Sequence, residues 1–272
     1  MTSPNYQSLA KRRILLAEDV EMNQQLARHM MQSWGIEVDI AANGKVALGL
    51  VEQNGYDLVL MDIHMPEMDG MEATRHIRLL SDPSRATVPI VALTANALKG
   101  DRERYLEAGM NDYLSKPFNE ADLFRIISKN LTNMTTTETA MQTDLLVNGH
   151  ATVNNVLEQD KLYNLKMIQD IAGGDESFVR RMLQLFLDTM PLTLQDLEKE
   201  TGQQNWQQVG KLAHKLKSTV DSMNIVQLKE VIRQIEQQGK KAENIDQLPI
   251  MVNRVTEVML ATAAQVKKDY NL

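Results

Sequence analysis

Short apolar runs alternate with amphipathic stretches through the first half of this chain, and the alternation limits its possible folds more than any other feature. Five such runs, each followed by polar residues, begin at Arg13, Val38, Asp57, Pro89 and Asp112. Their nearly continuous apolar character is typical of parallel strands that are covered on both faces. Helical spacing occupies the segments 23–34, 70–80, 100–108 and 119–131. The pattern predicts an α/β domain at 13–131 built on a five-stranded parallel sheet.

The second half of the chain has a different period. From residue 157 to residue 272 only helical spacing occurs, in the segments 178–197, 206–223, 226–238 and 248–268. Short connections between such helices predict an all-α helical bundle. The intervening residues 132–156 are rich in Thr and Asn and have no sustained apolar period, which predicts a flexible linker. Residues 1–12 are expected to form an N-terminal tail.

Composition excludes several classes of function. The formal charge of −7 comes from 36 acidic and 29 basic residues spread along the chain, so no basic tract indicates nucleic acid binding. No apolar run approaches the roughly 20 residues that span a bilayer, and no signal peptide core is present, so direct membrane insertion is not expected. The absence of cysteine excludes disulfides and zinc–thiolate sites. We expect a cytoplasmic protein whose partners are proteins.

Polar side chains stand at the ends of four predicted strands. Glu18 and Asp19 end the first, Asp62 the third, Thr94 the fourth and Lys116 the fifth. A five-stranded sheet of this kind is flavodoxin-like, and such sheets bind ligands beyond the carboxyl ends of their strands. Three converging carboxylates repel one another unless a cation joins them, and hard oxygen ligands favour Mg²⁺. Thr94 and Lys116 can hold a phosphoryl group, which makes Asp62, between the two sets, the expected nucleophile.

Two other classes of phosphate site fit less well. Dinucleotide and flavin domains need a glycine-rich turn after the first strand, where this chain has AEDVEMN. Haloacid-type phosphatases carry a second acid two residues after the nucleophile, where this chain has His64. Efficient multiple-turnover hydrolysis is therefore not expected, and the ring of His64 is expected to be an ordinary surface group.

The segments DLVLMDIHMPEMDG, LTANA and YLSKPF give residues 13–130 a specific resemblance to the receiver domains of two-component response regulators. The resemblance implies Asp62 as phosphoacceptor, with Thr94 and Lys116 as phosphoryl contacts. It implies Tyr113 as a switch aromatic and Ala95 as a small residue that leaves the phosphoryl group accessible. It also implies four magnesium ligands, namely Glu18, Asp19, Asp62 and the main-chain carbonyl of His64.

One histidine lies on the polar face of a predicted helix. At about 100° per residue, an apolar stripe forms from Val209, Leu212, Leu216, Val220 and Met223. His214 falls nearly opposite and is expected to project into water, flanked by Lys211 and Lys217. These ammonium groups can stabilise a phosphoryl group on the imidazole, and the small Ser218 one turn on leaves room for a partner.

The segment AHKLKSTVDSMN resembles the motif of histidine phosphotransfer (Hpt) domains, which places such a domain at 157–272. Ser218 and Asn224 stand where that family usually has glycine; serine is small, and asparagine tolerates the left-handed conformation at a helix end. In an antiparallel hairpin, Glu236 lies about as far after the turn as His214 lies before it. Glu236 is therefore a candidate to orient the imidazole.

Together these features predict a phosphorelay intermediate resembling the C-terminal part of hybrid sensor kinases. Asp62 accepts a phosphoryl group from a phosphohistidine with Mg²⁺, and His214 carries it to or from a receiver aspartate. The implied partners are an upstream sensor histidine kinase and a downstream response-regulator receiver domain. No glycine-rich nucleotide-binding box of an ATP-dependent kinase is present. The alternative is a phosphorylation-controlled docking or dimerisation module without relay through His214.

Overall fold

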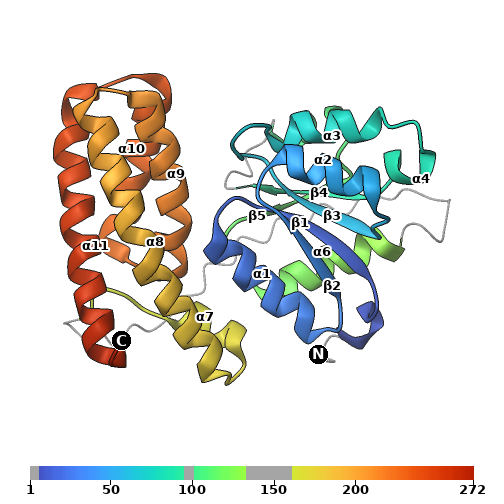
Figure 1. Ribbon diagram of the computed structural model, residues 1–272, viewed down its shortest axis with the longest axis horizontal. Helices are drawn as coiled ribbons and strands as arrows, with labels where there is room; N and C mark the ends of the chain where they lie inside the picture. Colours follow the sequence, from blue (N-terminus) through green and yellow to red (C-terminus); the bar gives the residue numbers. More distant parts are fainter. Residues whose placement is uncertain (1–5, 95–100, 133–160) are drawn as a thin grey trace.

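A computed structural model describes residues 6–94, 101–132 and 161–272, which form a sheet-containing domain and a helical bundle (Figure 1). Ala95 and all of the predicted linker except Thr132 lie outside these residues. Among the described helices, none has both the length and the apolar character needed to cross a membrane.

The first domain contains the predicted five-stranded parallel sheet. Its strands are β1 Arg13–Ala17, β2 Glu37–Ala41, β3 Leu58–Asp62, β4 Ile90–Thr94 and β5 Asp112–Ser115. Their spatial order is β2-β1-β3-β4-β5, with every neighbouring pair parallel. This confirms the flavodoxin-like α/β class, and it brings the ends of β1, β3, β4 and β5 to one edge.

Helices cover both faces of the sheet (Figure 1). Helices α1 Glu21–Ser33 and α6 Glu120–Thr132 pack on the face formed by residues such as Leu60 and Leu93. The opposite face, which includes Val59 and Ala92, is covered by α2 Gly44–Gln53, α3 Gly70–Arg78 and α5 Asp101–Glu107. A short helix, α4 Pro83–Ala86, precedes β4. The sequence pattern missed α2, whose Gly44 and Gly49 weaken its helical signal.

Part of the expected N-terminal tail packs on this domain. Residues Tyr6–Leu9 form the 3₁₀ helix η1, and Leu9 is buried. The ring of Tyr6 stacks on Trp34 at a centroid distance of 5.3 Å and meets the edge of Phe124 at 4.8 Å. These aromatic residues cover part of the core on the α1/α6 side of the sheet.

The second domain is a helical bundle, as predicted. A short helix, α7 Lys166–Ala172, leads into α8 Glu176–Gly202, α9 Trp206–Ser222, α10 Lys229–Lys241 and α11 Leu248–Tyr270. The 3₁₀ helices η2 Val226–Leu228 and η3 Ile245–Gln247 precede α10 and α11. Asn224, between α9 and η2, has a φ of +48°, the left-handed conformation that makes asparagine acceptable there. The sequence pattern missed α7, which has only two turns.

Helix α1 of the first domain packs against the helical bundle. It contacts α7, α8 and α9, and its Met22 and Leu26 belong to the apolar cluster of the bundle. The ring of His29 stacks on Phe178 of α8 at a centroid distance of 3.8 Å. Through these contacts, α9 lies beside the carboxyl ends of the strands.

Candidate functional site

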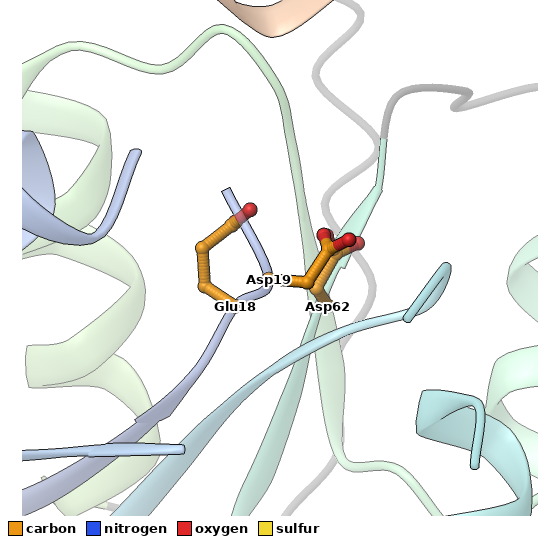
Figure 2. Close-up of side chains that lie close together, drawn as sticks. All are labelled: Glu18, Asp19 and Asp62. Atoms are coloured by element: carbon orange, nitrogen blue, oxygen red, sulfur yellow. The ribbon is translucent and has the colours of Figure 1, made fainter. Parts of the chain in front are cut away.

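Three carboxylates meet at the strand ends (Figure 2). Glu18 and Asp19 directly follow β1, and Asp62 is the last residue of β3. Because Ala17 pairs with Met61, Glu18 and Asp62 stand at the same level of the sheet. One oxygen from each of the three side chains lies within 4.8 Å of the others. The structure thus brings together the acidic cluster that the sequence predicts.

Lys116 compensates part of this negative charge. Its Nζ donates to Asp62 Oδ2 at 2.7 Å and also to Glu18. Burial, with a contribution from Asp62, raises the pKa of Glu18 to about 7 despite the opposing effect of Lys116. Burial opposes the charge of Lys116 as well, but Asp62 and Glu18 hold its pKa above the ordinary value. The ammonium group of Lys116 therefore forms ion pairs with two buried carboxylates.

The remaining carboxylate makes the site fit a cation. The pKa of Asp19 is raised, first by burial and then by the charge of Asp62. Its Oδ1 is buried without a hydrogen-bond partner among the described residues, while Oδ2 lies 3.5 Å from Lys215 Nζ. A buried carboxylate oxygen with no donor, beside two further acidic groups, is suited to a hard divalent cation such as Mg²⁺.

Thr94 and Tyr113 belong to β4 and β5, the two strands that follow β3 in the sheet. Thr94 is fully buried at the end of β4, and its hydroxyl is 2.9 Å from the hydroxyl of Tyr105 in α5. Tyr113, in β5, is half-buried in the core on the α5 side of the sheet. Sequence reasoning missed Tyr105, because one aromatic residue in an amphipathic helix looks like any core residue.

Gly70, the first residue of α3, fixes the backbone of Asp62. Its N–H donates to the carbonyl of Ile63 at 3.0 Å, and a Cβ added at Gly70 would lie only 2.1 Å from the carbonyl oxygen of Asp62. Backbone atoms cannot move aside as a flexible side chain can. The segment from Asp62 to Gly70 therefore requires glycine at its end.

We expect Gly70→Ala to destabilise the protein by about 3 kcal/mol, because the new methyl group displaces the backbone of Asp62. Gly49→Ala is the matched control: nothing lies within 4 Å of a Cβ at Gly49, and alanine favours a helix interior by up to about 1 kcal/mol. Denaturant unfolding of both variants measures the difference. Equal stability of the two variants would show that Gly70 is not needed for close packing.

His214 lies on α9 with its Nδ1 2.6 Å from Glu236 Oε1 of α10. Glu236 also accepts from Lys217 Nζ at 2.5 Å and from Lys240 Nζ at 2.7 Å. Burial would raise the pKa of Glu236, but His214 and Lys217 lower it well below its usual range. The ionised carboxylate can therefore accept a hydrogen bond from Nδ1–H, which leaves Nε2 as the ring nitrogen with the lone pair.

Close packing of α9 and α10 brings His214 and Glu236 within hydrogen-bond distance. A Cβ at Gly239 would lie 2.7 Å from the Trp206 carbonyl oxygen and 2.8 Å from the amide nitrogen of Gly210. Gly210 is one turn before His214, and Gly239 is almost one turn after Glu236. The sequence analysis singled out neither glycine, because close approach of two helices depends on how they cross.

The two domains meet at the candidate site. Instead of projecting into water, the side chain of His214 is only 12% exposed, and its ring lies 5.1 Å from that of His64. His64 itself is exposed, as expected. A cavity of about 80 Å³ is lined by Asp62 and Lys116 from one domain and by His214, Lys217 and Ser218 from the other. Lys211 is exposed on α9.

Comparisons with known proteins agree with this division. Residues 14–128 match the family model "Response regulator receiver domain", and residues 181–264 match "Hpt domain". Aerobic respiration control sensor protein ArcB from Escherichia coli K12 is 33% identical over 225 residues, which are 82% of this chain and 27% of that protein. Signal transduction histidine-protein kinase BarA from Shigella flexneri is 29% identical over 239 residues, covering 86% of this chain and 25% of BarA.

A solved structure matches the first domain. It is the receiver domain of a sensor histidine kinase from Pseudomonas aeruginosa, described with a magnesium ion coordinated in its active site cleft. The two sequences are 47% identical, the match covers 45% of this chain and 99% of the other, and the TM-score is 0.42. The chain spans about a quarter of the length of ArcB and BarA.

Proposed function

This chain carries a response regulator receiver domain followed by an Hpt domain, and we propose that it is an intermediate of a two-component phosphorelay. In this proposal Asp62 receives a phosphoryl group from the phosphohistidine of a sensor histidine kinase. His214 then takes the group and exchanges it with the aspartate of a downstream receiver domain. The observation that carries the proposal is that Asp62 and His214, from different domains, line one cavity.

The receiver domain supplies the first acceptor. Asp62 attacks phosphorus with a carboxylate oxygen, the bond between phosphorus and the donor imidazole breaks, and an acyl phosphate forms. Glu18, Asp19, Asp62 and the carbonyl of His64 would hold Mg²⁺, which would neutralise charge on the carboxylates and the phosphoryl oxygens. Lys116, which is paired with Asp62, would contact the phosphoryl group, and Thr94 at the neighbouring strand end would be the second contact.

The Hpt domain supplies the second acceptor. Nε2 of His214 attacks phosphorus, the bond to the Asp62 oxygen breaks, and the aspartate carboxylate is restored. Glu236 orients the imidazole through Nδ1 and stabilises the positive charge that develops on the ring. Lys217 adds an ammonium group near the phosphoryl oxygens, and Ser218 keeps the approach open.

Contacts outside the reacting groups support transfer within one chain. Met22 and Leu26 bury apolar surface against the bundle, and the His29–Phe178 stack lies on the same side of α1. Lys215 reaches Asp19 across the domain boundary. Together they hold His214 beside the strand ends of its own chain.

Removal of magnesium tests the receiver half. We expect a small phosphodonor such as acetyl phosphate to phosphorylate the protein with Mg²⁺ and not in excess chelator, because the acidic cluster repels the donor without its cation. Intact-mass analysis measures the addition, and restoring Mg²⁺ after chelation is the control. Equal incorporation with and without chelator would contradict the proposed metal site.

Replacement of Glu236 tests the Hpt half. We expect Glu236→Ala to slow phosphorylation of His214 by about 10- to 100-fold, because the imidazole loses the group that orients it. The initial rate of Asp62 labelling should not change, and the label should stay on Asp62 for longer. Glu230→Ala, which removes an exposed carboxylate of the same helix, is the matched control. Peptide mapping of phosphohistidine over time measures both rates, and equal rates would remove Glu236 from the mechanism.

A further inference from the structure

The hydroxyl groups of Tyr105 and Thr94 are hydrogen-bonded to each other, and both residues are buried. We propose that Tyr105 is a positioning residue that holds Thr94 in a resting orientation and must release it when Asp62 is phosphorylated. The inference rests on the proposed function of Asp62. Tyr105 in α5 would then respond to phosphorylation in addition to Tyr113 in β5, the switch aromatic that the resemblance implies.

The register of the sheet places Asp62 and Thr94 toward opposite faces. Asp62 pairs with Leu93, and paired residues of parallel strands point to the same face. Leu93 packs in the core on the α1/α6 side, so Thr94, the next residue, is directed to the α5 side. Ala92, two residues earlier in the same strand, packs there together with Tyr105. Thr94 must therefore turn toward the strand ends before its hydroxyl can reach a phosphoryl group on Asp62.

The bond to Tyr105 opposes that turn. Whichever of the two hydroxyls donates, their hydrogen bond keeps the Thr94 oxygen beside Tyr105, whereas a phosphoryl oxygen would accept the Thr94 proton in a stronger, charge-assisted bond. Burial raises the pKa of Tyr105, so its hydroxyl remains neutral and available to Thr94 at physiological pH. The resting bond and the phosphoryl bond thus compete for the orientation of Thr94, and breaking the first frees one anchor of α5 from the sheet.

Tyr105→Phe tests the inference because it removes the hydroxyl and keeps the ring. The probe is beryllofluoride, a phosphoryl mimic, titrated with Mg²⁺ into the full chain. We expect Tyr105→Phe to bind it about two- to tenfold more tightly than wild type, since only the unbound state loses a hydrogen bond. Tyr56→Phe is the matched control: it also loses one tyrosine hydrogen bond, to Asp39 at 2.8 Å, and should bind like wild type.

The same Tyr105 substitution in a Thr94→Val variant shows whether Tyr105 acts through Thr94. With Thr94→Val already present, adding Tyr105→Phe should leave beryllofluoride affinity unchanged, and the two substitutions should be non-additive in thermal unfolding of the unbound protein. Equal affinity of wild type and Tyr105→Phe, or weaker binding by the variant, would overturn the inference alone. Failure of wild type to bind beryllofluoride would overturn the assignment of Asp62 and this inference with it.

Discussion

Asp62→Asn should abolish phosphoryl incorporation at both acceptors, Asp62 and His214, when acetyl phosphate and Mg²⁺ are supplied. The asparagine side chain has nearly the same shape, but its amide does not form an acyl phosphate. His214 has no other source of a phosphoryl group under these conditions if the relay runs through the receiver domain. The expected result is a fall to background at both positions, measured by peptide mapping.

A matched variant separates loss of the acceptor from loss of the fold. Asp82→Asn changes a half-buried aspartate that caps α4 and is not part of the acidic cluster, and it should be labelled like wild type. Thermal unfolding of both variants checks that each is folded. Labelled His214 in folded Asp62→Asn would show that the imidazole reacts with the donor directly, and the relay order would be wrong.

Transfer between Asp62 and His214 should be much faster within one chain than between chains. The linker that the sequence predicts, about 25 residues long, would span roughly 25–30 Å and would keep the domains at about millimolar effective concentration. His214→Gln retains a working receiver and Asp62→Asn a working Hpt domain, so their mixture can relay only between chains. At about 1 μM protein we expect wild type to exceed the mixture by about 100- to 1000-fold.

Dilution provides the decisive comparison for this prediction. The wild-type rate should not change with protein concentration, whereas the rate of the mixture should rise in proportion. His29→Ala removes the stack on Phe178 and should slow wild-type transfer, while His76→Ala on the exposed surface of α3 should not. A mixture that matches wild type at every dilution would mean that transfer occurs between chains.

The sequence predicts those parts of the molecule that depend on local patterns. Apolar runs bounded by polar residues mark the five strands, and parallel topology alone brings Glu18, Asp62 and Lys116 to one edge. The helical wheel separates His214 from the core stripe, and hairpin geometry points to Glu236, which the structure places 2.6 Å from the imidazole.

Features that depend on contact between distant segments could not be predicted in this way. Nothing in the local pattern distinguishes Gly70, whose special role is set by the carbonyl of Asp62. The same holds for Gly239, which lies against the backbone of Gly210. The helical wheel also predicts that His214 faces water, because a wheel describes one helix and contains no information about a second domain that covers it.

The most direct test of the account is a chase of the phosphorylated protein. Wild type is labelled briefly with a radioactive phosphodonor and Mg²⁺, the donor is removed, and phosphoaspartate and phosphohistidine are quantified over time by their different stability to acid and base. We expect the label lost from Asp62 to appear on His214, and we expect His214→Gln to retain the label on Asp62 until hydrolysis. Release of all the label as inorganic phosphate from wild type, with none passing through His214, would contradict the relay and leave a phosphorylation-controlled docking module.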